Sequence, residues 1–165
     1  MANKGYKVIA AIALSVGLGL SCFAVEPTSI PQNIVTNPST VNPPTSSYSQ
    51  SVRVPIGNTS LIFISGQVAR DPKGNLVGKG DIRAQTEQVF RNIGAILKAN
   101  NASFGDVVRE TIFVTDIAQR PEITQVRKRY FTHNPPTSTF VEVRRLTSPD
   151  WLLEIEAIAV VHKGH

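Results

Sequence analysis

The stretch Leu-Leu-Glu-Ile-Glu-Ala-Ile-Ala-Val-Val occupies residues 152–161 and alternates in a way that is typical of a β-strand. Glu154 and Glu156 lie two residues apart in it, so both carboxylates are expected on the same face of the sheet. Upstream, residues 139–145 alternate as well, and Ser-Pro-Asp at 148–150 has turn chemistry. These two segments therefore predict a closing antiparallel pair.

A two-stranded hairpin is predicted earlier in the chain. Residues 51–56 (Ser-Val-Arg-Val-Pro-Ile) and residues 61–67 (Leu-Ile-Phe-Ile-Ser-Gly-Gln) are separated by the turn residues Gly57 and Asn58. Two strand-like runs around such a turn favour antiparallel pairing. The apolar run 61–64 predicts that the second strand lies inside the sheet.

Two predicted helices flank a further strand. Asp81 is a suitable N-cap for a helix over residues 82–100, where apolar residues recur at steps of three and four. Residues 106–116 have the composition of a strand, and Pro121 can open a second helix that ends at Asn-Pro-Pro, residues 134–136. The resulting order β-β-β-α-β-α-β-β predicts an α+β domain.

The first 24 residues have the pattern of a secretory signal peptide. Lys4 and Lys7 precede an apolar run from Val8 to Leu20, which is shorter than a bilayer span. This pattern predicts export to the periplasm, with cleavage of the signal peptide after Ala24. Lipidation of Cys22 is the alternative, and only that route would attach the protein to a membrane.

The remainder of the chain is expected to hold one domain. Residues 25–31 are expected to form a flexible linker, the start of a Pro-, Ser-, Thr- and Asn-rich stretch that also supplies one edge strand. Residues 32–163 are expected to fold together, because a chain of 165 residues that is 41% hydrophobic supplies one compact core.

Composition excludes several kinds of site. Cys22 is the only cysteine, so the exported domain would contain no disulfide, no thiol nucleophile and no thiolate metal ligand. The formal charge of +5 is too small for a polycationic nucleic-acid binder, so nucleic acid is not an expected partner. No phosphate loop, dinucleotide fingerprint or metal motif occurs, and we expect neither a cofactor nor a metal.

Several short motifs then occur together in an order that resembles the Rid (YjgF) family. They are Tyr48-Ser49-Gln50, Ile64-Ser65-Gly66-Gln67, Gln85 with Asn92, Asn134-Pro135-Pro136, Val141-Glu142-Val143 and Glu-Ile-Glu-Ala-Ile-Ala at 154–159. The likeness spans residues 32–161. It implies a chorismate-mutase-like α+β fold, with a mixed sheet packed by two helices, and a homotrimer with clefts between subunits. Active members of that family hydrolyse reactive 2-imino or enamino acids to keto acids and ammonia.

The resemblance also implies substrate contacts near residue 138. In the family, an arginine after the Pro-Pro segment binds the substrate carboxylate, but Ser138 stands there in this chain. Loss of a charge-assisted pair should weaken binding by about 2 kcal/mol, or roughly thirtyfold. Thr139 follows as a second contact, and Phe140 either reshapes the cleft or serves as a core aromatic residue. Arg144 or Arg145 could supply the missing charge, both could face solvent, or the substrate could lack a carboxylate.

A carboxylate and a cleft floor complete the implied site. Glu154 corresponds to the residue that holds or activates the attacking water, a task that suits a carboxylate because hydrolysis needs a proton acceptor. For Glu156 we favour a solvated face or an intersubunit salt bridge. Tyr48 corresponds to a residue that closes the cleft, and Ser65 and Gly66 correspond to its floor. For these three, packing or a bend in the strand is the alternative role.

Three kinds of function remain open from the sequence. The first is hydrolytic deamination of imines or enamines in the cell envelope, with a small imine, enamine or related metabolite as the partner. The second is a non-catalytic trimer that binds small metabolites or acts like a chaperone, which the serine at position 138 favours. The third is RNA-directed activity, which export and the lack of a catalytic histidine constellation argue against.

Overall fold

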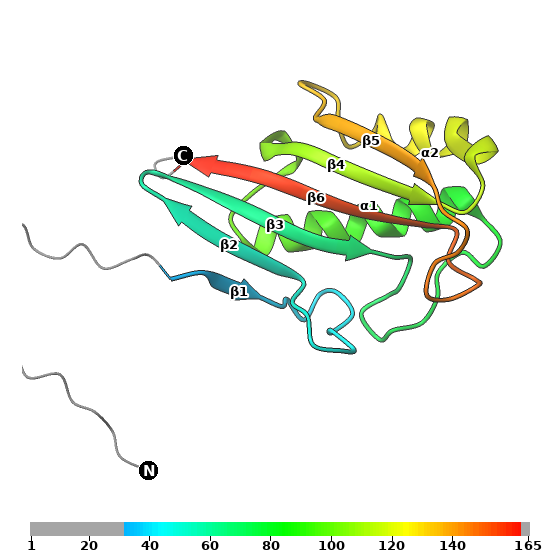
Figure 1. The fold of residues 1–165 in the computed structure, drawn as a ribbon, viewed down its shortest axis with the longest axis horizontal. Coiled ribbons are helices and arrows are strands. Elements are labelled where there is room, and N and C mark those ends of the chain that lie inside the picture. Colours follow the sequence, from blue (N-terminus) through cyan, green and yellow to red (C-terminus); the bar gives the residue numbers. More distant parts are fainter. Residues whose placement is uncertain (1–31, 163–165) are drawn as a thin grey trace, which may run out of the picture.

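A six-stranded mixed sheet and two helices form the protein in the computed structural model, which describes residues 32–162 (Figure 1). The strands are β1 (Ile34–Thr36), β2 (Ser51–Ile56), β3 (Thr59–Gln67), β4 (Val107–Val114), β5 (Thr137–Glu142) and β6 (Leu153–His162). The helices are α1 (Ile82–Ala99) and α2 (Arg120–Arg127), with short 3-10 turns at Phe104–Asp106 and Ile117–Gln119. The expected α+β class and element order are confirmed. The expected signal peptide, Cys22 and the 25–31 linker lie outside the described residues.

The strand order is β1-β2-β3-β6-β4-β5. The predicted hairpin is confirmed as the antiparallel pair β2–β3, and β1 is the expected edge strand. The predicted antiparallel pairing of β5 with β6 is wrong. β5 instead pairs in parallel with β4, and β6 lies antiparallel between β3 and β4.

Side-chain burial explains this difference. One face of β6 is buried along its whole length. In β5, by contrast, all residues except Phe140 are exposed, and four of these five exposed residues are polar. A strand of that composition is suited to the edge of a sheet, and the apolar strand is suited to its centre. The crossover through α2 then makes β4 and β5 parallel.

The first helix begins as predicted. Asp81 is its N-cap, and Oδ1 accepts hydrogen bonds from the backbone N–H groups of Arg83 and Ala84 at 2.9 and 3.0 Å. Its apolar face packs on the sheet through the buried residues Val89, Phe90, Ile93, Ile96 and Leu97. The α1 prediction is therefore confirmed to within one residue at each end.

The second helix is shorter than predicted and ends at Arg127. The next residues form a turn, and both Tyr130 and Phe131 contact Phe90. The ring centroid of Phe90 lies 4.8 Å from that of Tyr130 and 5.9 Å from that of Phe131. The backbone hydrogen bonds also change here. Lys128 N–H donates to the carbonyl of Thr124, four residues earlier, whereas Arg129 and Tyr130 donate to Val126 and Arg127, three residues earlier. The α-helix therefore ends in a tighter turn.

The helices cover only one face of the sheet (Figure 1). The β6 residues Leu153, Ile155 and Ala157 face this core and are buried, so the alternating Glu154 and Glu156 lie on the opposite face, as predicted. The uncovered face therefore carries the two carboxylates.

Candidate functional site

A pocket of about 410 Å³ opens where β3 ends and β6 begins. Its walls come from the 42–50 loop, the end of β3, the segment that follows it, α1 and the approach to β6. The lining residues are Asn42, Thr45, Ser46, Tyr48, Gln50, Ser65, Gly66, Gln67, Val68, Arg70, Asn92, Thr147, Trp151 and Glu154. Four residues predicted from sequence are thus brought together: Tyr48, Ser65, Gly66 and Glu154.

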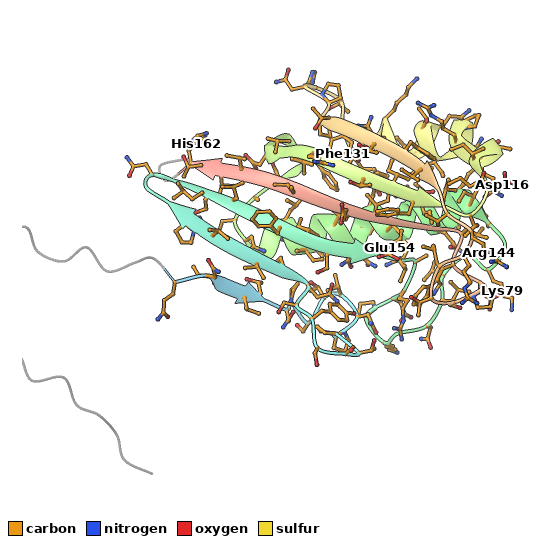
Figure 2. All side chains as sticks on the ribbon, viewed as in Figure 1. Lys79, Asp116, Phe131, Arg144, Glu154 and His162 are labelled. Carbon is orange, nitrogen blue, oxygen red and sulfur yellow. The ribbon has the colours of Figure 1, made fainter. Side chains whose placement is uncertain are left out.

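Glu154, which is labelled in Figure 2, lies half-buried in the wall of this pocket. Burial raises the pKa of its carboxyl group, and the negative charge of Glu156 raises it further. A carboxyl group with a raised pKa binds and releases a proton nearer to neutral pH than an exposed glutamate does. The position therefore suits a group that exchanges protons with a bound ligand or water.

Gly66 makes room for that carboxyl group. A Cβ atom built on Gly66 would overlap the Glu154 carboxylate and would lie 2.7 Å from its carboxyl carbon. The absence of a side chain at Gly66 therefore lets the glutamate lie against the β3 backbone.

A second pair of contacts fixes the loop that carries Tyr48. Ser65 Oγ donates a 2.6 Å hydrogen bond to the carbonyl of Ser49, and the Ser65 N–H donates to the carbonyl of Gln50 at 3.0 Å. The buried Gln67 side chain donates to Oε1 of Gln50 at 2.7 Å. These bonds hold the loop on β3, with Tyr48 44% exposed at the pocket.

Two amides of α1 hold the other walls. The buried Gln85 donates to the carbonyl of Asp150 at 2.8 Å and accepts from the N–H of Leu152 at 2.9 Å, which fixes the segment that carries Trp151. Asn92 donates to the carbonyls of Val68 and Arg70 at 3.1 and 3.0 Å. The side chains of one helix thus position two separate loops.

Residues 138–140, which were predicted to contact the substrate, lie away from this pocket. Ser138 and Thr139 are exposed on β5, in register with Glu110 and Thr111 of β4, and two strands separate β5 from β3. Phe140 packs against the core, with the guanidinium of Arg120 5.4 Å from its ring centroid. Within one copy of the chain, none of these three residues lines the pocket.

Several lining residues were not predicted from the sequence. Arg70 is the clearest example, because it is the one cationic side chain among the lining residues of this pocket. Arg144 and Arg145, the other candidate sources of positive charge, are exposed and do not line it. The available signal was an arginine directly between the Ser65-Gly66-Gln67 strand end and a turn.

Residues 32–162 contain neither a cluster of metal-ligand side chains nor a membrane-spanning helix. No three His, Cys, Asp or Glu side chains in this range gather as metal ligands would. No helix within the range has the length and apolar character needed to cross a bilayer.

Comparison with known proteins adds context to this geometry. The sequence profile of the endoribonuclease L-PSP family matches residues 39–161. A RutC family protein of Pyrococcus horikoshii is 42% identical over 116 residues, which are 70% of this chain and 88% of that protein. The human 2-iminobutanoate/2-iminopropanoate deaminase is 34% identical over 113 residues, which are 68% of this chain and 79% of the human protein.

The fold is similar to that of solved structures as well. The crystal structure of Escherichia coli TdcF with bound serine superposes with a TM-score of 0.69 at 32% sequence identity. The superposition covers 78% of this chain and 98% of TdcF. The similarity therefore extends over nearly the whole of that protein.

Proposed function

The chain belongs to the endoribonuclease L-PSP family, also called the Rid or YjgF family, and we propose that it hydrolyses reactive 2-imino or enamino compounds. The products are the corresponding keto compound and ammonia. The observation that carries the proposal is the half-buried carboxyl group of Glu154, with its raised pKa, in a pocket large enough for a small metabolite. The similarity to the human 2-iminobutanoate/2-iminopropanoate deaminase and to TdcF with bound serine supports a small, amino-acid-like ligand.

Glu154 acts on water in this proposal. Its carboxylate accepts a proton from a water molecule as the oxygen attacks the carbon of the C=N bond, and it passes that proton to the imine nitrogen. The product is a carbinolamine. Glu154 then accepts the hydroxyl proton of the carbinolamine as the carbonyl forms and passes it to the nitrogen, which leaves as ammonia when the C–N bond breaks. One water is consumed per imine, and Glu154 returns to its starting state. A carboxyl group with a raised pKa is suited both to accepting these protons and to releasing them.

We further propose that the working form is a homotrimer with a cleft between neighbouring subunits. The support is the separation of β5 from the pocket, because Ser138 and Thr139 can contact a ligand at Glu154 only if another copy presents them. The resemblance of the sequence to the family implies that other members have an arginine where this chain has Ser138. The exchange removes one charged contact and favours substrates that gain their binding energy from other residues.

Cellular location is a separate proposal that rests on the sequence. The lysine-flanked apolar leader supports export to the periplasm, with lipidation at Cys22 as the alternative. Imine hydrolysis would then take place in the cell envelope.

A non-catalytic metabolite-binding protein is the second candidate. The observation in its favour is Ser138, since a cleft that has lost a substrate contact can still bind ligands. The two candidates make opposite predictions for turnover.

The test uses the purified exported domain. An amino-acid oxidase generates imines from several amino acids, semicarbazide traps them, and the rate of keto-acid release is followed. We expect the protein to accelerate release, and we expect Glu154→Gln to abolish the acceleration. Glu122→Gln on α2 removes the same charge outside the pocket and serves as the matched control. If no imine is hydrolysed faster than in buffer, the hydrolase proposal is wrong and the metabolite-binding candidate is favoured.

A further inference from the structure

Among residues 32–162, Arg70 is the one positively charged side chain that lines the pocket, and Glu154 lines it too. We propose that Arg70 binds the carboxylate of the substrate, in place of the arginine that is absent at Ser138. This inference rests on the proposed function and defines its substrate class as small 2-imino acids that carry a free carboxylate.

The side chain of Arg70 is held in place by the turn that follows it. Its Nε donates a 2.9 Å hydrogen bond to the carbonyl of Gly74. Gly74 has φ +89°, and a Cβ atom added to it would lie 2.8 Å from Nη2 of Arg70 and 2.9 Å from Oδ1 of Asn42. The turn therefore packs closely around the guanidinium, and glycine allows both the backbone conformation and the approach.

The backbone of Arg70 is fixed from the other side by α1. Its carbonyl accepts hydrogen bonds from Asn92 Nδ2 at 3.0 Å and from Gln88 Nε2 at 3.3 Å. The backbone of Arg70 also forms an isolated antiparallel β-bridge with Leu76. A cation restrained at both backbone and side chain loses little further conformational entropy when a ligand binds, which favours tight recognition of a small anion.

The charge of Arg70 is not neutralised by a carboxylate in the described part of the chain. The salt bridges among residues 32–162 are made by Lys79, Arg91, Arg127 and Arg129. Of the side-chain nitrogens of Arg70, only Nε has a hydrogen-bond partner among these residues. Its terminal nitrogens therefore remain as donors, and a planar guanidinium can present two parallel N–H groups to the two oxygens of a carboxylate.

The two charges in the pocket would also orient the ligand. A 2-imino acid with its carboxylate on Arg70 keeps its negative end away from Glu154, whereas the reverse orientation would bring two carboxylates together. The imine carbon, adjacent to the carboxylate carbon, is then on the part of the ligand that Glu154 does not repel. Charge complementarity of this kind selects orientation as well as affinity.

Binding of pyruvate and pyruvamide, followed by ligand-observed and protein-observed NMR, tests the proposal without turnover. The two probes have similar size and differ in that one carries a carboxylate and the other a neutral amide. We expect the protein to prefer pyruvate, and we expect Arg70→Gln to weaken pyruvate binding by about 10- to 100-fold with little effect on pyruvamide. Arg70→Lys should keep part of the preference, since it retains the charge without the planar fork.

Arg83→Gln is the matched control, because Arg83 lies on α1, outside the pocket, and its guanidinium donates to Gln125. The inference is overturned if the wild-type protein shows no preference for pyruvate, or if Arg70→Gln retains it. Failure of the proposed function gives a different result: the wild-type protein then binds pyruvate through Arg70 but accelerates no imine hydrolysis. Retained hydrolysis together with a pyruvate preference that does not depend on Arg70 would overturn the inference alone.

Discussion

Gly66 lies directly against the carboxyl group of Glu154, so closely that a Cβ atom on residue 66 would stand 2.7 Å from its carboxyl carbon and 2.9 Å from its Cγ. The two residues belong to adjacent strands of the sheet, β3 and β6. The strand backbone at Gly66 thus sets where the carboxylate can be.

Gly66→Ala should therefore displace the Glu154 side chain. Displacement of a reacting group by about 1 Å can reduce the rate by roughly 100-fold, and we expect a loss of that order in kcat/KM for imine hydrolysis. The unfolding temperature should change little, because the displaced atoms belong to a flexible side chain at a half-open pocket. A variant that loses its fold but keeps its rate per folded molecule would contradict this expectation.

The pH dependence of hydrolysis should depend on Glu156. Glu154 must be ionised to accept a proton, so kcat/KM should fall as pH is lowered through its raised pKa. Glu156→Gln removes the neighbouring negative charge that contributes to this rise. The acid limb of the pH–rate profile should then move to lower pH in the variant. A limb that stays in place would show that Glu154 is not the titrating group.

Glu154→Gln should stabilise the fold at neutral pH while removing activity. A folded-state pKa above the unfolded value means that stability is fully present at low pH and is lost as pH rises through the folded pKa. Glutamine does not ionise, so the variant escapes this loss. Thermal unfolding should show a gain for the variant at about pH 7 that shrinks toward about pH 4. An equal gain at both pH values would point to a cause other than ionisation.

The salt bridge between Arg127 and Glu110 should be important for stability. Glu110 is 1% exposed, and its second oxygen has no hydrogen-bond partner among the described residues. Arg127→Met leaves this carboxylate buried without its cation and should cost about 3–5 kcal/mol of unfolding free energy in denaturant titrations. Adding Glu110→Gln should recover a large part of the loss. If the double variant is no more stable than Arg127→Met, the buried charge is not the cause.

Local chemistry made part of this fold predictable. Asp81 ahead of apolar residues at helical spacing, and Gly57-Asn58 between two strand-like runs, each determine structure through nearby contacts. The pairing of β5 was not predictable in the same way, because alternation identifies a strand without identifying its neighbour. The turn that ends α2 likewise places Tyr130 and Phe131 against Phe90, a residue far from both in sequence.

The candidate site was likewise predictable only in part. Glu154 and Gly66 stood out because their motifs resemble those of a family, whereas Arg70 carries no distinctive spacing. Its importance comes from Gly74, which binds its side chain, and from Asn92, which binds its carbonyl from another element. Such contacts become visible only when the loops are placed in space.

The central place of β6 has a consequence for synthesis of the protein. β6 is the last strand in chain order, yet it separates β3 from β4 in the sheet. Until β6 has been synthesised, β1–β3 and β4–β5 therefore lack the strand that joins them, and the edges of β3 and β4 have no partner among the described strands. Addition of β6 joins the two groups and places Glu154 at the pocket in the same step.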